Sequence, residues 1–226
     1  MDIHFIKENI PLYVEAAGLT VRIALIGILC AFLVGLFCSM IRYLKVPILK
    51  GMVQGYIELS RNTPLLIQLY FLYFGLPKIG ILFSSEQCAI IGLAFQGGSY
   101  MAEAFRSGLE SVSKVQKDTG LSLGMTEKQV LQYVVLPQAI STSVPVFCAN
   151  VIFLIKETSV FSAVALADLL FVTKDLIGIY NKTDEALWML VIAYLLLLLP
   201  ISILSSVLER KVRYAGFGNT STVSGK

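Results

Sequence analysis

The chain has 226 residues, of which 56% are hydrophobic and 15% charged, and its mean hydropathy is +0.77. Soluble domains carry about 25% charged residues, so this chain has too little polar surface for water and is predicted to be an integral membrane protein. The net charge of +3, with no basic patch interleaved with aromatic residues, excludes nucleic acid as a partner.

The sequence offers few side chains for catalysis or metal binding. The four cysteines, Cys30, Cys38, Cys88 and Cys148, lie in apolar runs without a CxxC pair, so we expect small buried side chains. The only histidine is His4, which argues against a histidine metal site and against a Ser/His/Asp hydrolase. No GxxxxGK[ST] phosphate loop occurs, so the chain is not itself an ATPase. We expect no catalytic residue, no metal and no bound cofactor.

The charge-free stretches predict five membrane-crossing helices in one transmembrane domain of residues 1–226. A helix needs about 20 apolar residues to cross the hydrocarbon core. The first residues, MDIHFIKENIP, lack a signal-peptide pattern, so the first apolar segment is expected to be retained. A further apolar stretch, Thr158–Ala167, is too short to cross and is expected to be interfacial or re-entrant, packed on protein. The expected spans lie near residues 18–42, 62–80, 86–107, 136–156 and 185–208.

Two short patterns in the first spans are predicted to be structural. Gly27, Ala31 and Gly35 form a small-xxx-small stripe, which is typical of a helix-packing face. Arg61-Asn62-Thr63-Pro64 is typical of a helix start, because a proline in the first turn needs no N–H partner.

The third predicted span carries a polar stripe. Gln96, Ser99, Tyr100 and Glu103 stand at i, i+3, i+4 and i+7, on one helical face. Polar groups facing lipid are costly, so this face should point at protein or at a water-filled cavity. One interpretation is the lining of a translocation pathway. The alternative is contact between helices, with Glu103 paired to Arg61 or Arg106.

A polar segment, residues 108–136, joins the third and fourth spans. Ser113-Lys-Val-Gln116 and Thr126-Glu-Lys-Gln129 each match a capping box, in which two side chains satisfy free amides at a helix start. Glycine permits a turn at Gly124. We predict a short helix over about 115–123, a break near Gly124 and a second helix from Glu127. Such a helix suits docking into a partner's groove, although an ordinary loop covering helix ends is the alternative.

The fourth predicted span offers a second polar face. Asn150 and Glu157 are seven residues apart and nearly aligned, and Lys156 is adjacent. A zwitterionic substrate needs donors for its carboxylate and acceptors for its ammonium group, so these three side chains are plausible ligands. The alternative is that Lys156 and Glu157 end the span and pair with Asp168 or Asp175.

Orientation follows from the basic residues that flank the spans, because cytoplasmic loops are richer in Lys and Arg. Twelve basic residues flank the spans on one side of the membrane and five on the other. The side with twelve is predicted to be cytoplasmic, which places the N-terminus outside and the C-terminus inside. The five on the other side are Lys7, Lys78, Lys156, Lys174 and Lys182. The twelve are Arg42, Lys45, Lys50, Arg61, Arg106, Lys114, Lys117, Lys128, Arg210, Lys211, Arg213 and Lys226.

The cytoplasmic segment resembles the EAA loop of ABC-importer membrane subunits, which reads E-A-A, three residues, G, nine residues, then I-x-L-P. Asp118-Thr119-Gly120 stand at E-A-A, Gly124 at the glycine, and Val134-Val135-Leu136-Pro137 close the pattern in register. Gln116 matches the glutamine that usually precedes the acidic residue. The chain departs from the pattern by having Asp-Thr-Gly in place of Glu-Ala-Ala.

Three further runs are similar to those of polar amino-acid permeases. ELSRNTPLLIQLYFLYFGLP (58–77) resembles E-L-x-R-G-T-P-L-L-x-Q-L-x-F-x-Y-F-G-L-P, with Asn62 in place of glycine. SYMAEAFRSGLESV (99–112) resembles the A-E-x-x-R-G-G-I segment, and IKETSV (155–160) resembles K-D/E-T-S-L. The resemblance runs from about residue 15 to residue 214 in consistent order.

The resemblance implies an all-α membrane protein with the type I ABC importer transmembrane fold, in the cytoplasmic membrane of a prokaryote. It implies two permease subunits, identical or paralogous, that form the pathway in membrane lipid. Two ABC ATPase subunits would bind ATP and Mg, and an extracytoplasmic binding protein would deliver a polar amino acid. The implied ATPase-coupling residues are Gln116, Lys117, Asp118, Thr119, Gly120, Ser122, Leu123 and Gly124. The alternative is a secondary transporter driven by an ion gradient, which would need buried acidic relays and usually internal repeats.

Overall fold

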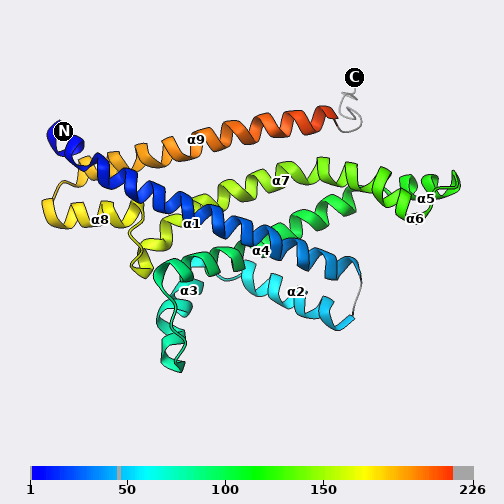
Figure 1. Ribbon diagram of the computed structural model, residues 1–226, viewed down its shortest axis with the longest axis horizontal. Coiled ribbons are helices and arrows are strands. Elements are labelled where there is room, and N and C mark those ends of the chain that lie inside the picture. Colours follow the sequence, from blue (N-terminus) through cyan, green and yellow to red (C-terminus); the bar gives the residue numbers. More distant parts are fainter. Residues whose placement is uncertain (1, 45–46, 216–226) are drawn as a thin grey trace, which may run out of the picture.

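The computed structural model describes residues 2–44 and 47–215, and every element in these ranges is helical (Figure 1). Lys45 and Lys226, which counted toward the orientation prediction, lie outside the described residues. The elements are α1 (Ile3–Tyr43), α2 (Pro47–Arg61), α3 (Leu65–Tyr70), η1 (Phe71–Gly75), η2 (Leu76–Ile79), α4 (Ser85–Ser111), α5 (Lys114–Ser122), α6 (Glu127–Gln129), η3 (Val130–Val135), α7 (Leu136–Glu157), η4 (Thr158–Val164), α8 (Leu169–Tyr180) and α9 (Thr183–Ala215).

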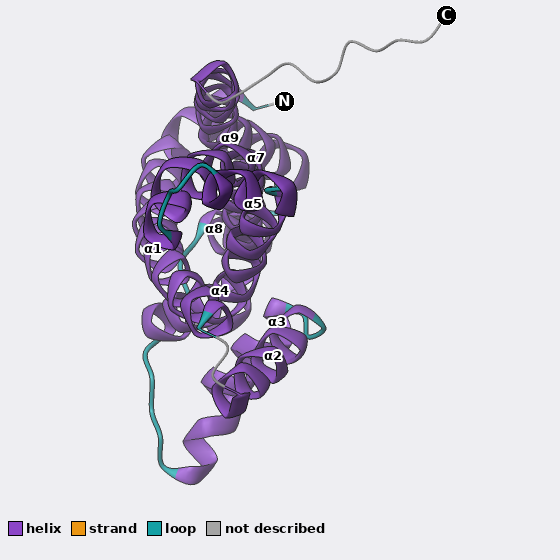
Figure 2. Cartoon of the chain, turned by 90° about the vertical axis from the view of Figure 1, so that its right-hand side faces the viewer, coloured by secondary structure: helices purple, strands orange, loops and turns teal. Residues whose placement is uncertain are grey.

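Four long helices, α1, α4, α7 and α9, run side by side and form an elongated bundle (Figure 1). The most extensive packing joins α1 to α4, and α4 in turn packs on α7. In Figure 2, α9 stands at the opposite side of the bundle from α2 and α3. Most of the large apolar side chains of α9 are exposed, as expected for a helix surrounded by lipid or by other subunits.

Three helical stretches are long and apolar enough to cross a membrane within the described residues: Ile3–Tyr43, Glu127–Val164 and Thr183–Val212. Each contains one of the predicted spans, although the helices are longer than predicted. The two other predicted spans coincide with the shorter apolar stretch Leu65–Ile79 and with α4. The 27 residues of α4 extend about 40 Å, enough to cross the hydrocarbon core, but α4 carries polar side chains.

The packing of α1 on α4 depends on the small residues of α1. Ala31 is completely buried, and a methyl group added at Gly27 would lie 2.7 Å from Cδ2 of Leu93. One added at Gly35 would lie 2.4 Å from Cβ of Met101. The predicted packing face is therefore confirmed, because these positions let the two backbones approach each other closely.

The sequence did not predict α2, which folds back along α4. Val53 and Ile57 of α2 pack with Cys38 of α1 and Ala102 of α4. Because Ser60 at the end of α2 reaches Phe95, the helix ends beside the middle of α4.

The predicted position of the helix start is confirmed, since α3 begins at Leu65, but Pro64 is the N-cap instead of lying in the first turn, and no side chain caps this helix. The side-chain amide of Gln68 donates to the carbonyls of Ser60 (3.1 Å) and Thr63 (3.0 Å), so one side chain bridges the break between α2 and α3. From this break, α3 and its continuation turn away from the long axis of the bundle (Figure 1).

At the far end of the bundle, η4 and α8 form a compact cap. Phe161 and Val164 of η4 are completely buried, so the expectation that 158–167 packs on protein is confirmed. Ala165 adopts a positive φ of 55° and ends η4, and the carboxylate of Asp168 caps α8 by accepting from the N–H of Phe171 (2.7 Å). Leu169 packs in a cluster that also contains residues of α1 and α9.

The four cysteines are free thiols. Cys38, Cys88 and Cys148 are buried, as predicted, whereas Cys30 is half-buried. Among the described residues, no three His, Cys, Asp or Glu side chains gather in a way that would hold a metal ion.

Candidate functional site

The segment between α4 and α7 forms a compact knuckle that projects from one end of the bundle (Figure 1). The predicted helix is α5, and Ser113 begins it by accepting from the N–H of Gln116, which is one of the two bonds of the first predicted capping box. Both hydrogen bonds of the second capping box, between Thr126 and Gln129, are present. Gly124 lies between the two helices with a φ of +84°, a conformation that favours glycine. The helix–break–helix prediction is therefore confirmed.

Packing fixes this knuckle to α7. A methyl group added at Gly120 would lie 2.9 Å from Cγ2 of Val130, and the carbonyl of Gly120 accepts from the N–H of Met125 (3.1 Å). Val130 and Val135 belong to a small apolar cluster with Val112 of the α4–α5 link. Glycine at position 120 accommodates Val130 where alanine would press against it. Val130 belongs to the continuous helical run Glu127–Val164 that includes α7, so α5 is in direct contact with that run.

The outer surface of the knuckle is polar with isolated apolar side chains. Val115 is 72% exposed and Leu123 is 79% exposed, although both lie beyond the long apolar helices. The hydroxyls of Thr119 and Ser122 donate to carbonyls of their own helix, at Val115 and Asp118. Of the eight predicted coupling residues, Gly120 is buried, Lys117 is half-buried, and the exposed ones are Gln116, Asp118, Thr119, Ser122, Leu123 and Gly124.

The polar stripe of α4 lies against α2 and α7. The Ser60 hydroxyl donates to the hydroxyl of Ser99 (3.1 Å), which donates to the carbonyl of Gln96 (2.7 Å). Ser99 is completely buried. Gln96 is 5% exposed, and its side-chain oxygen is buried without a hydrogen-bond partner. Ser99 therefore makes the interhelical contact expected under the alternative interpretation, whereas the unpaired oxygen of Gln96 is a free acceptor in the middle of the molecule.

Tyr100 is half-buried and connects three elements. The guanidinium of Arg61 lies 5.2 Å from the centroid of its ring, and the ring of Phe153 on α7 lies 5.1 Å away. The side-chain amide of Asn150 donates to the carbonyl of Tyr100 (3.2 Å). The arginine at the α2–α3 break, an aromatic ring and an amide thus meet at mid-bundle.

Glu103 forms ion pairs within the bundle. It accepts from Arg106, one turn further along α4 (2.7 Å), and from Arg42 of α1. The prediction of a pair with Arg106 is confirmed, whereas Arg61 lies over Tyr100 instead. The pair with Arg42 joins α1 to α4 at the knuckle end of the bundle, and the pair with Arg106 lies within α4.

The end of α7 differs from the expected pairing. Lys156 is exposed and Glu157 is half-buried, and neither has an ion pair with Asp168 or Asp175 among the interactions that the described residues make. Asp168 instead caps α8, completely buried, and its second carboxylate oxygen has no hydrogen-bond partner. Burial raises its pKa from 3.8 to about 6, even though the N–H of Phe171 favours the ionised form. Lys174 of α8 donates to Ser162.

The sequence analysis missed Ser60, the contact of the α4 stripe on α2. Ser60 lies in a helix that was not predicted, because its apolar side chains are interrupted by Lys50, Gln54 and Glu58. The buried residues Val53, Ile57 and Ser60 recur at a spacing of three or four, and this helical period is the signal that could have predicted α2.

Comparison with known proteins adds a family relationship. The sequence profile of the family described as "Binding-protein-dependent transport system inner membrane component" matches residues 24–214. The chain is 33% identical over 174 residues to a probable amino-acid ABC transporter permease protein, PatM of Vibrio harveyi, covering 75% of this chain and 77% of that protein. It is 34% identical over 164 residues to a probable glutamine ABC transporter permease protein, GlnP of Bacillus subtilis (strain 168), covering 73% and 75%.

Solved structures show the same architecture. A crystal structure of an amino acid ABC transporter with histidines superposes with a TM-score of 0.88 at 28% identity, over 93% of this chain and 99% of that one. An inward-facing structure of the MetNI methionine ABC transporter superposes with a TM-score of 0.72 over 89% and 96%. At 20% identity, the second comparison supports the fold alone.

Proposed function

Because the chain belongs to the family of binding-protein-dependent transport system inner membrane components and is the permease subunit of an ABC importer, we propose that it carries polar amino acids into the cell. The same relationships exclude the rival interpretation of a secondary transporter. The substrate class is taken from relatives described as amino-acid and glutamine permeases and from the amino acid transporter of similar structure.

The proposed topology has five spans, with the N-terminus outside and the knuckle and C-terminus in the cytoplasm. Apart from the charge bias of the loops, it is supported by α5, a polar helix beyond the ends of the apolar helices. The second span would consist of α2 and α3–η2, broken at residues 62–64. The location would be the cytoplasmic membrane of a prokaryote, as the bacterial relatives suggest.

In the proposed assembly, two copies of this chain, or this chain and a paralogue, pair with two ATPase subunits and receive substrate from an extracytoplasmic binding protein. The observation that carries the coupling role is the surface of α5. Val115 of α5 and Leu123 just after it are exposed to solvent, while Gly120 packs on Val130 of η3, which continues into α7. ATP and Mg would be bound by the partner ATPases, whose closure would displace α5 and, with it, α7.

For the pathway we propose the polar groups around Tyr100. Gln96 offers an unpaired acceptor, and Asn150 and Arg61 offer donors beside the ring. Glu157, further along α7, is half-buried without an ion pair among the described residues and would serve as an acceptor for an ammonium group. Lys156 and Ser99 are the weaker candidates, because one is exposed and the other already bonded. Glu103, held by two arginines, is a positioning group.

The test of coupling uses the assembled importer in proteoliposomes with its ATPase and binding protein. Gly124→Trp should abolish uptake and substrate-stimulated ATP hydrolysis while the permease remains folded, because a bulky side chain at the knuckle blocks docking. Gly80→Trp is the matched control, since Gly80 has a φ of 85° and, like Gly124, no atom within 4 Å of an added methyl group. Asp118→Lys should reduce both activities as well. Equal uptake by wild type and Gly124→Trp would contradict the assignment.

The substrate is tested by competition. Vanadate should block uptake, and excess glutamine, arginine, cystine or an acidic amino acid should each be compared as a competitor of labelled substrate. Only a polar amino acid should compete if the proposal holds. Competition by none of them, with vanadate-sensitive uptake of another solute, would retain the importer and overturn its proposed cargo.

A further inference from the structure

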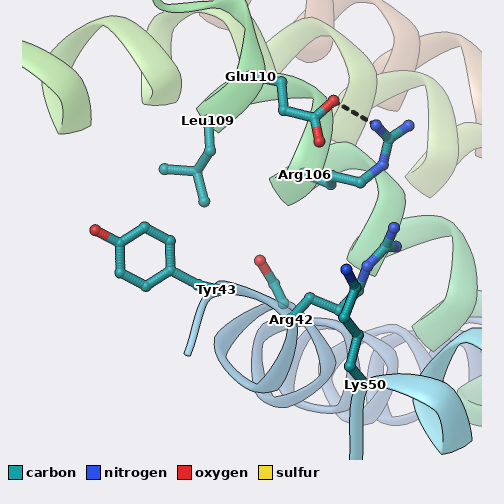
Figure 3. A pocket seen from close by; sticks show the side chains of 7 residues that line it. Arg42, Tyr43, Lys50, Arg106, Leu109 and Glu110 are labelled. Carbon is teal, nitrogen blue, oxygen red and sulfur yellow. Dashed lines mark hydrogen bonds and ion pairs between the residues drawn. The ribbon is translucent and has the colours of Figure 1, made fainter. Parts of the chain in front are cut away.

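A charged pocket lies at the knuckle end of the bundle, where α1 ends, α2 begins and α4 ends. Its volume is about 530 Å³, and its charged lining consists of Arg42, Lys50, Arg106 and Glu110. Figure 3 shows the cationic groups gathered on one side and the ring of Tyr43 with Leu109 on the other. None of these residues belongs to the proposed pathway or to the docking surface of α5.

The pocket carries an excess of positive charge. Arg106 is bonded to Glu103 and Glu110, and Arg42 shares Glu103. With Lys50, three cations stand against these two anions. Lys50 is exposed and has no ion pair among the described residues. The guanidinium of Arg42 uses Nη1 toward Glu103, and a guanidinium has five N–H donors in all. Donors and net charge are therefore left for an anion.

An apolar groove adjoins this pocket. It has a volume of about 630 Å³, lies between α1, α4 and α7, and shares Ser39, Tyr43 and Leu109 with the charged pocket. Its remaining walls are almost entirely apolar and include Leu36, Phe105 and Ile140. A soluble anion would contact only the charged half, whereas a molecule with an anionic head and a hydrocarbon chain would contact both.

We propose that these two cavities form a binding site for an anionic phospholipid, with the phosphate among Arg42, Lys50 and Arg106 and an acyl chain in the apolar groove. The proposal rests on the proposed topology, which places this end of the bundle at the cytoplasmic leaflet. Anionic lipids populate that leaflet, and basic pockets between membrane helices on that side bind their headgroups. Tyr43, at the boundary between pocket and groove, is the residue type that favours the headgroup level.

The site has a mechanical consequence because its walls belong to moving parts. Leu131 of η3 and Leu136 of α7 line the groove, and both lie in the helical run that starts at the knuckle. A lipid chain packed between this run and α1 contacts both and stabilises their present separation. Anionic lipid is therefore expected to alter the basal ATP hydrolysis of the complex.

The test measures lipid retention by native mass spectrometry of the detergent-purified permease–ATPase complex, titrated with phosphatidylglycerol or phosphatidylcholine. No amino acid, binding protein or transport is needed, so failure of this site and failure of the proposed function are distinguishable. Phosphatidylglycerol should be retained in preference to phosphatidylcholine. Lys50→Gln should weaken its binding about fivefold, as expected for loss of one basic residue near an anionic lipid. Lys211→Gln, an exposed lysine that lines neither cavity, should leave binding unchanged.

The groove is tested separately. Ile140 lines it and is 58% exposed, so Ile140→Trp should fill it and release the lipid without unfolding the helix. Ile203→Trp, at a 63% exposed position on α9 outside the groove, is the control. Equal retention of the two lipids, or binding unaffected by both Lys50→Gln and Ile140→Trp, would overturn the proposal. Displacement of the lipid by inorganic phosphate at similar concentration would overturn it too, and would indicate a soluble anion instead.

Discussion

The close contact between α1 and α4 predicts that Gly35→Ala will destabilise the permease. The added methyl carbon would lie 2.4 Å from Cβ of Met101 and 2.8 Å from the backbone nitrogen of Ala102. Carbon atoms in contact are normally about 3.5–4.0 Å apart, so α1 and α4 would have to separate by about 1 Å. Backbone atoms cannot rotate out of the way, which distinguishes this position from Gly27, where the opposing atoms belong to the side chain of Leu93.

The magnitude follows from two opposing terms. Overpacking of a tight core costs about 1–3 kcal/mol. Replacement of glycine by alanine inside a helix contributes about 0.5–1 kcal/mol of stability, so the two ranges leave a net loss of about 0–2.5 kcal/mol, centred a little above 1 kcal/mol. Gly18 lies on the same helix with nothing within 4 Å of an added methyl group. Gly18→Ala should therefore show only the gain in stability from replacing glycine by alanine in a helix.

The assay is thermal unfolding of the detergent-purified permease, followed by the reaction of a thiol dye with the buried cysteines Cys38 and Cys88. For a chain of this size, 1 kcal/mol corresponds to about 2–4 °C in Tm. We expect Gly35→Ala to melt several degrees below wild type and Gly18→Ala at or slightly above it. If Gly35→Ala melted as high as Gly18→Ala, the close approach of α1 and α4 would be refuted.

Three further predictions follow from individual hydrogen bonds and charges. Glu103→Gln should lower stability by roughly 1–3 kcal/mol in the same thiol assay, because Arg42 and Arg106 lose a shared charged acceptor; an unchanged Tm would contradict this. The pKa of Asp168 is raised on folding to about 6, so its contribution to stability is complete below pH 3.8 and lost as the pH rises through about 6. Asp168→Asn should therefore gain on the order of 2–3 kcal/mol over wild type at pH 8 and little near pH 4; a gain at pH 4 and none at pH 8 would reverse the reasoning. Thr126→Ala should remove one cap at a cost of about 1 kcal/mol, seen as faster amide hydrogen exchange in α6 and η3 but not in α9.

Much of the fold was predictable from the sequence because membrane helices follow simple rules. Long apolar runs predicted α1, α7 and α9, and the small residues at 27, 31 and 35 predicted the face that packs on α4. The capping residue Ser113, the capping box of Thr126 and Gln129, and Gly124 between them predicted the helix–break–helix arrangement of the knuckle almost to the residue. These signals are local, so one sequence contains them.

What the sequence could not give depends on partners distant along the chain. The stripe on α4 predicted that Ser99 and Glu103 face protein, but it left open which helices they meet, and α2 and α1 provide the contacts. Likewise, the alternative interpretation of span four paired Lys156 or Glu157 with Asp168, whereas Asp168 caps α8, because the backbone turn at Ala165 directs the chain back over the end of the bundle. The helix α2 escaped prediction since its buried face is only one residue wide per turn.

The break between α2 and α3 divides this part of the chain into two helical arms, α2 before it and α3 with η1 and η2 after it. A continuous helix resists bending through every hydrogen bond along it, whereas across this break the amide of Gln68 donates to the carbonyls of Ser60 and Thr63. Breaking these two hydrogen bonds costs about 1 kcal/mol each, which is less than unwinding a helical turn in lipid. Leu65 and Leu69 of α3 are buried in the core, so the start of the second arm stays with the bundle, whereas η1 and η2 beyond it contain no buried side chain.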